Sequence, residues 1–189
     1  MLHRAVLMTL LVIGLAQSVP GAPQPSEKTR LAKAAEAIKR IEGVYKTRFA
    51  NSTVHDEKFL SEDILEIVSY DTDKIYFRLH LEFFNAHICD LFGIATYEEG
   101  SFVFHGPAGV SEEPCKLAIS IADRSIKLDD AGGNCRQYSC GARGGYSGAG
   151  FPLSSRREIR YLKLVKASRE YAEAITEFEE LLKAAAGKH

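Results

Sequence analysis

Apolar and polar residues alternate with a period of two along the middle of the chain, most clearly over residues 75–83. Ile75, Phe77, Leu79, Leu81 and Phe83 alternate there with Tyr76, Arg78, His80 and Glu82. Alternation of this kind is typical of a β-strand that has one apolar face and one polar face. The same period recurs on both sides of this run, so the pattern predicts a series of short strands joined by hairpins.

The predicted strands follow one another from residue 44 to residue 163. They span 44–49, 64–70, 75–83, 87–97, 101–105, 115–121 and 126–128, with a last strand around 159–163. A meander of this size must curl or close to hide its edge strands. We therefore expect a mainly β, α+β fold, either an antiparallel meander or a small closed, calycin-like β-barrel. A two-sheet sandwich is the alternative.

A helical period is found on either side of the predicted strands. The first stripe consists of Leu31, Ala34, Ala35, Ile38 and Ile41, in a helix that Ser26 can cap and that ends near Glu42. The second and larger stripe consists of Tyr171, Ala174, Ile175, Phe178, Leu181 and Leu182, in a helix that Ser168 can cap. The second stripe is large enough to require a partner surface, either the barrel wall or the first helix.

Residues 1–22 have the pattern of an export signal. Arg4 supplies a positive start, and an apolar run from Ala5 to Ala16 follows it. This run is shorter than the roughly 20 residues that cross a bilayer. Cleavage is expected after Ser18 or Gly21. We expect residues 23–189 to form a single β-barrel-like domain with no membrane span. We expect this domain to be periplasmic or secreted.

Net charge excludes one class of partner. The chain of 189 residues has a formal net charge of -1. Nucleic-acid binding requires an excess of positive charge that replaces the counterions of the phosphates, and this chain has none. We therefore expect no nucleic-acid partner.

Four cysteines, Cys89, Cys115, Cys135 and Cys140, agree with export. An even number in an exported chain points to two disulfide bonds. The hairpin at 98–100 brings Cys89 near Cys115, so we favour Cys89–Cys115 together with Cys135–Cys140. The alternative is a pair that ties the loop around Cys135 back to a strand. The cysteine spacing does not match that of zinc sites, and we expect no metal and no cofactor.

The stretch CRQYSCGARGGYSGAGFP, residues 135–152, differs most from generic protein sequence. Arg136, Tyr138, Arg143 and Tyr146 lie in it among glycines and without a carboxylate. Arginine and tyrosine make large contacts and strong hydrogen bonds to carboxylate or phosphate, so we interpret the four residues as a candidate binding surface. In the alternative interpretation, the glycines serve tight turns, the arginines cap carbonyls and the tyrosines fill the core.

A second group of polar residues could perform acid–base chemistry. Arg78, His80 and Glu82 share one face of a predicted strand, and His87 follows closely. The same spacing is expected of any strand whose polar face meets solvent. The sequence around Ser147 is one residue short of a nucleophile elbow, so we expect no catalytic residues.

The residues Cys135-Arg136-x-Tyr138-x-Cys140-Gly141-Ala142-Arg143-Gly144 resemble a group of uncharacterised exported proteins of Gram-negative bacteria. This resemblance implies export. As an expected small exported β-barrel with a cysteine clamp, the chain is also similar, more distantly, to the periplasmic C-type lysozyme inhibitors. Those proteins insert a Ser-Gly-x-x-Tyr loop into the lysozyme cleft, and the similarity implies a binding role for Ser147. Phe151 stands where that pattern has tyrosine.

Three hypotheses follow. The first is a non-enzymatic exported binding module whose Gly/Arg/Tyr loop contacts a protein or a component of the cell envelope, as a lysozyme inhibitor does. The second is a calycin-like carrier of a small apolar ligand in a barrel cavity. The third is a hydrolase that uses His80 and Glu82.

Overall fold

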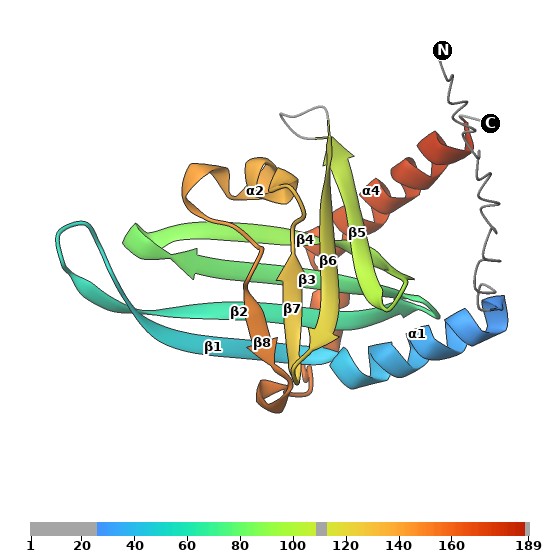
Figure 1. The fold of residues 1–189 in the computed structure, drawn as a ribbon, viewed down its shortest axis with the longest axis horizontal. Coiled ribbons are helices and arrows are strands. Elements are labelled where there is room, and N and C mark those ends of the chain that lie inside the picture. Colours follow the sequence, from blue (N-terminus) through green and yellow to red (C-terminus); the bar gives the residue numbers. More distant parts are fainter. Residues whose placement is uncertain (1–25, 109–112, 188–189) are drawn as a thin grey trace, which may run out of the picture.

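The sheet is an antiparallel meander (Figure 1). The computed structural model describes residues 26–108 and 113–187, so the predicted signal peptide 1–22 lies outside the described residues. Within the described chain, eight strands form one sheet in which each strand pairs with the next one along the sequence. They are β1 (Gly43–Ser52), β2 (Lys58–Asp71), β3 (Lys74–Phe83), β4 (His87–Glu98), β5 (Ser101–Ala108), β6 (Pro114–Ala122), β7 (Ser125–Asp129) and β8 (Gly150–Pro152).

Helices lie before, within and after the sheet. They are α1 (Glu27–Ile41), α2 (Asn134–Ser139), α3 (Leu162–Lys166) and α4 (Arg169–Ala186), with short 3-10 turns η1 (Phe84–Ala86), η2 (Gly141–Arg143) and η3 (Leu153–Ser155). The predicted caps are confirmed: Ser26 Oγ accepts a hydrogen bond from the Thr29 amide, and Ser168 Oγ accepts one from the Tyr171 amide. The structure thus confirms the predicted mainly β fold with a helix at each end.

The sheet nearly closes into a barrel because its two ends meet beside Val44. Val44 in β1 exchanges two backbone hydrogen bonds with Arg157, which follows β8, and both N–O distances are 2.9 Å. Gly43 allows this close approach, since a Cβ there would lie 2.8 Å from the Arg157 carbonyl oxygen. The predicted curling of the meander is therefore confirmed.

Apolar side chains from alternate strand positions fill the interior. Phe77, Leu79, Leu117 and Ile119 are each at most 1 % exposed and belong to one cluster. Phe77 packs against the ring of Phe104 with 5.3 Å between the ring centroids. Burial of each such side chain contributes about 1.5–3 kcal/mol, so this cluster is the main source of stability.

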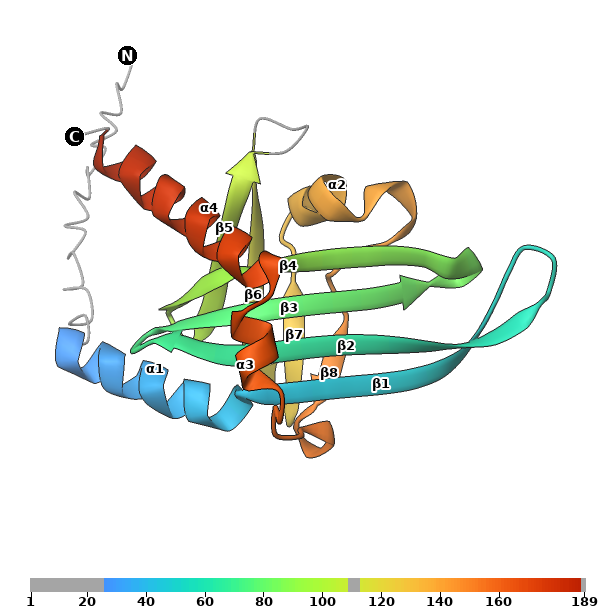
Figure 2. The same ribbon diagram turned by 180° about the vertical axis from the view of Figure 1, so that it is seen from behind.

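The outer face of the sheet is covered by α3 and α4 (Figure 2). Val68, Tyr76 and Ile94 project outward there and form a second apolar cluster with Val165 of α3 and Ala174 of α4. The apolar stripe of the C-terminal helix therefore packs against the barrel wall, which is one of the two partner surfaces expected from the sequence, and not against the first helix.

Several elements differ from the sequence prediction, most clearly in β2 and at the end of the sheet. β2 begins at Lys58 and not at Ile64, because β1 continues to Ser52 and pairs with it there. The predicted last strand at 159–163 is wrong. The chain instead turns into α3, in which the amides of Leu164 and Val165 bond to the carbonyl of Tyr161. The last strand lies earlier, at β8, because Phe151 inserts into the core opposite Ile126.

Candidate binding surface

Both disulfide bonds join α2 and its C-terminal end to the barrel. Cys89 of β4 pairs with Cys140, and Cys115 of β6 pairs with Cys135. All four residues are at most 4 % exposed. We call residues 130–149 the anchored segment. Its last residues return to β7, where the Leu128 amide bonds to the Ala149 carbonyl at 3.1 Å.

The favoured cysteine pairing is therefore wrong, and the alternative, in which the loop is tied back to a strand, is correct for both bonds. The reason is that β4 and β5 pair only between 95–98 and 101–104. Beyond Phe104 the two strands no longer pair, and α2 packs against β4 and β6 (Figure 1). Each strand cysteine consequently meets a cysteine of α2 rather than the other strand.

The Asp130 carboxylate fixes the start of α2. Its two oxygens accept the backbone N–H groups of Cys135 and Arg136, each at 3.0 Å, and Asp130 is only 3 % exposed. These bonds satisfy amides that have no partner within the helix. Sequence reasoning missed this role of Asp130, although an acidic residue shortly before a helix is a recognisable capping signal.

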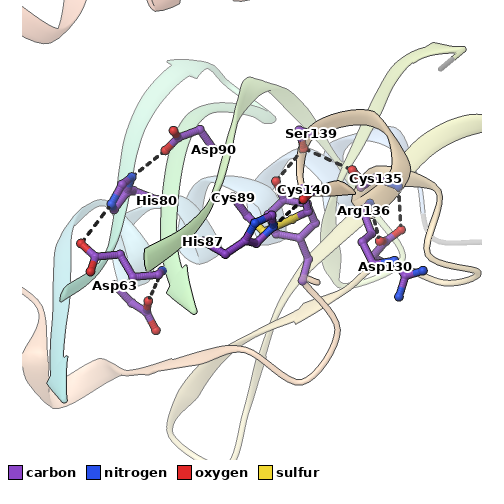
Figure 3. The surroundings of a disulfide bond; sticks show 12 residues. Asp63, His80, His87, Cys89, Asp90, Asp130, Cys135, Arg136, Ser139 and Cys140 are labelled. Atoms are coloured by element: carbon purple, nitrogen blue, oxygen red, sulfur yellow. Dashed lines mark hydrogen bonds and ion pairs between the residues drawn. A yellow bond between two sulfur atoms is a disulfide. The ribbon is translucent and has the colours of Figure 1, made fainter. Parts of the chain in front are cut away.

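His87 holds the other end of α2. Its Nε2 lies 2.6 Å from the carbonyl oxygen of Cys140, so this nitrogen donates the hydrogen bond. Figure 3 shows His87 pointing toward Cys140, while His80 lies outside the barrel beside Asp90. Of the four residues considered for acid–base chemistry, His80 and Glu82 are in contact at 3.4 Å. Arg78 instead pairs with Glu66 at 2.6 Å, and His87 is engaged at α2.

Two of the predicted binding residues serve the anchored segment itself. Tyr146 is fully buried, and its hydroxyl lies 2.6 Å from Ser139 Oγ. Burial raises the pKa of Tyr146. Ser147 is exposed, but its Oγ accepts the Asp130 amide at 2.8 Å and donates to Asp129 at 3.3 Å. In this arrangement, neither hydroxyl group is free to meet a partner.

The other three predicted residues, Arg136, Tyr138 and Arg143, are exposed on the anchored segment. Arg136 lines a hollow of about 390 Å³ together with Asp130, Gly132, Gly133, Gln137, Gly144, Gly145, Tyr146 and Ser147. Among the described residues, neither arginine has a carboxylate within 4.0 Å of its guanidinium group. Burial, assisted by the charge of Glu177, raises the pKa of Tyr138. Arg136 and Arg143 are thus both exposed on the anchored segment, and Arg136 lies in a hollow lined by four glycines.

His80 lies in a separate hollow of about 290 Å³ on the outer face of the sheet, lined by Lys46, Ile64, Glu66, Arg78, His80, Asp90 and Tyr161. Its ring contacts Asp90 at 2.6 Å and Glu82 at 3.4 Å. Partial burial lowers the pKa of His80, but the two carboxylates outweigh this effect and raise it above its ordinary value. No serine, threonine or cysteine is among the described residues that line this hollow.

Searches for other features and relatives give three results. Among residues 26–108 and 113–187, no group of three or more histidine, cysteine, aspartate and glutamate side chains could hold a metal ion. None of the helices in those ranges combines the length and the apolar character needed to cross a bilayer. Comparisons of the chain with protein-family models, with curated proteins and with solved structures find no match.

Proposed function

We propose that this protein is a non-enzymatic exported binding module and that its anchored segment contacts the partner through Arg136, Tyr138 and Arg143. The observation that carries the proposal is the pair of disulfide bonds at α2. They fix the segment to two strands, so little conformational entropy is lost when a partner binds. Disulfide bonds of this kind also fit an oxidising compartment, such as the periplasm or the exterior of the cell.

The chemistry of the surface favours a partner that presents carboxylate or phosphate groups. Guanidinium groups bind such anions with paired, charge-assisted hydrogen bonds. The glycines around the hollow let the backbone of a partner approach closely. Tyr138, which is 38 % exposed, adds an aromatic contact beside the cations. Aromatic and arginine side chains of this kind dominate the energy of many interfaces.

The proposal is tested by comparing three proteins in quantitative capture from a cell-envelope extract. They are the oxidised wild type, the Arg136→Ala/Arg143→Ala variant and the control Lys28→Ala/Lys33→Ala, which removes two exposed cations of α1. We expect one component that the wild type and the control retain and that the arginine variant binds at least tenfold more weakly. Equal retention by all three proteins would show that the anchored segment is not the binding surface.

The narrower proposal is that the partner is a C-type lysozyme. Ser147 and Gly148 form a turn in the anchored segment, but Phe151 is 1 % exposed in β8 and cannot reach a partner. An inhibitory contact would therefore rest on Arg136 and Arg143. Measured inhibition of lysozyme that is lost in the arginine variant supports this identity. If lysozyme keeps its full activity in the presence of a high concentration of this protein, C-type lysozyme is not the partner.

Neither alternative gains support from the geometry. A carrier requires a cavity, whereas Phe77, Leu79, Leu117 and Ile119 fill the barrel interior and line none of the hollows described above. A hydrolase requires a substrate site beside His80, but both of its ring nitrogens are already bound to carboxylates. We therefore build on the anchored segment alone.

A further inference from the structure

α3 crosses the outer face of the sheet (Figure 2). Exposed apolar and cationic side chains lie on α3 and on the two residues before it. We call residues 160–166 the basic strip. Leu164 is 72 % exposed, Leu162 is 38 % exposed and Tyr161 is 37 % exposed. The exposed cations Arg160, Lys163 and Lys166 alternate with these apolar residues. Large apolar side chains exposed together indicate an interaction site when they form a patch.

The backbone of the basic strip is held firmly on the barrel. Val165 is 2 % exposed and packs in the second apolar cluster under α3. The Tyr161 hydroxyl donates a hydrogen bond to Glu66, which is 3 % exposed and also pairs with Arg78. These contacts fix which side chains of α3 point inward. The exposure of Leu162 and Leu164 is therefore set by the fold and not by fraying of the chain.

The cations of this region form no ion pair with the described part of the chain. Among the described residues, no carboxylate lies within 4.0 Å of Arg157, Arg160, Lys163 or Lys166. By contrast, Lys46 and Arg48 in β1 both pair with Glu62. The whole chain has a net charge of -1, whereas residues 160–166 contain three cations and no carboxylate, so positive charge is locally in excess there.

Two hollows flank the segment that leads into the basic strip. One has a volume of about 570 Å³ and is lined by Val44, Lys46, Arg157, Glu158, Arg160 and Tyr161. The other, about 560 Å³, lies between α1 and Ile159. The charged residues in its wall are Lys39, Glu42, Arg156, Arg157 and Glu158. Each hollow could accept an anionic group beside an arginine.

We propose that the basic strip binds the surface of an anionic lipid bilayer. Leucine side chains can enter the boundary between headgroups and acyl chains, while neighbouring lysines and arginines reach the phosphates. Each cation near such a surface strengthens binding by about fivefold. A protein partner is disfavoured because lysine is depleted in protein interfaces, and this strip places Lys163 and Lys166 directly beside the exposed leucines.

The experiment is co-sedimentation of the folded protein with two kinds of vesicle. One contains phosphatidylglycerol mixed with phosphatidylcholine, and the other contains phosphatidylcholine alone. We expect binding to the anionic vesicles that weakens as salt is added. The variant Lys163→Glu/Lys166→Glu should bind at least about 25-fold more weakly, since it removes two cations and adds two negative charges. Its matched control is Lys28→Glu/Lys33→Glu, which makes the same charge change on α1 and should bind like the wild type.

A second pair of variants tests the apolar contribution. Leu164→Ser should weaken binding to anionic vesicles by about tenfold. The control Leu182→Ser changes a leucine of α4 that is 54 % exposed and lies outside the basic strip, and it should bind like the wild type. Because Leu164 projects into solvent, its replacement is expected to leave the fold intact.

Three results would overturn the proposal. The first is that the protein does not bind phosphatidylglycerol vesicles at low salt. The second is that the Lys163→Glu/Lys166→Glu variant and its control lose vesicle binding equally. The third is self-association of the protein that Leu164→Ser abolishes. The last result would show that a second copy of the chain covers the strip. The Arg136→Ala/Arg143→Ala variant should retain vesicle binding, so failure of the function proposed above and failure of this proposal can be told apart.

Discussion

Ser139 Oγ and the hydroxyl of Tyr146 lie 2.6 Å apart beneath α2, where Tyr146 is fully buried. The same Ser139 Oγ also donates to the Cys135 carbonyl at 3.1 Å. The two residues thus connect the two halves of the anchored segment from inside. In the function proposed above, Tyr146 acts indirectly, because it holds the segment that carries Arg136 and Arg143.

Tyr146→Phe is expected to lower the free energy of unfolding by about 1–2 kcal/mol, because it removes a buried hydrogen bond. Tyr146→Ala should cost about 3–5 kcal/mol, because it also leaves a cavity. Urea denaturation of the oxidised protein measures both changes. The exposed Tyr138→Ala is the control and should cost less than 1 kcal/mol. A Tyr146→Ala variant as stable as this control would contradict the internal role of the ring.

Peptide mapping of the unreduced protein should recover Cys89 linked to Cys140 and Cys115 linked to Cys135. The sequence separations are 51 and 20 residues. Loop-closure entropy therefore predicts stabilisation of about 4 kcal/mol for the first bond and about 3 kcal/mol for the second. Two variants, each with both cysteines of one bond replaced by alanine, test this difference. Denaturation measures the free energy of unfolding that each variant loses. A peptide in which Cys135 is joined to Cys140 would contradict the arrangement.

Gly144 and Gly145 should respond differently to the same substitution. A Cβ at Gly144 would lie 2.2 Å from the sulfur of Cys89, whereas the nearest atom to a Cβ at Gly145 is 3.8 Å away. Gly144→Ala must therefore displace the disulfide and should cost at least 2 kcal/mol, about the loss expected from overpacking. Gly145→Ala, its neighbour and control, should change stability by less than about 0.5 kcal/mol. Thermal unfolding of the two variants measures the stability that each one loses.

The pKa of His80 is raised in the folded protein above the ordinary value of 6.5, despite partial burial, because Asp90 and Glu82 favour the charged ring. Its contribution to stability is therefore complete below about pH 6.5 and is lost as the pH rises through the folded pKa. Asp90→Asn should therefore lower the free energy of unfolding relative to the wild type. This loss should be larger at about pH 5.5 than at about pH 8.5.

NMR titration of the His80 ring provides the direct measurement. Asp90→Asn should lower the pKa more than Glu82→Gln does, since the ring lies 2.6 Å from Asp90 and 3.4 Å from Glu82. An equal effect of the two variants, or a pKa below 6.5 in the wild type, would show that the carboxylates do not control this ring.

The first seven strands and both caps were predictable because the forces that set them are local, whereas β8 was missed. The direction of a side chain along a strand alternates with every residue, so the run 75–83 identified its inward face correctly. Ser26 and Ser168 cap amides three residues away. The even number of cysteines was sufficient to predict two disulfide bonds, which the structure confirms.

Only the tertiary structure decided which cysteines pair and which tyrosine is buried. The pairing depends on where β4 and β5 stop pairing, which no short stretch of sequence encodes. Tyr138 and Tyr146 lie in the same glycine-rich stretch, yet one is exposed and the other is covered by α2. Val165 and Leu164 are adjacent apolar residues that face opposite ways, because the barrel wall offers a partner to only one of them. Local sequence sets the direction of a side chain, and the packing of distant elements determines what it meets.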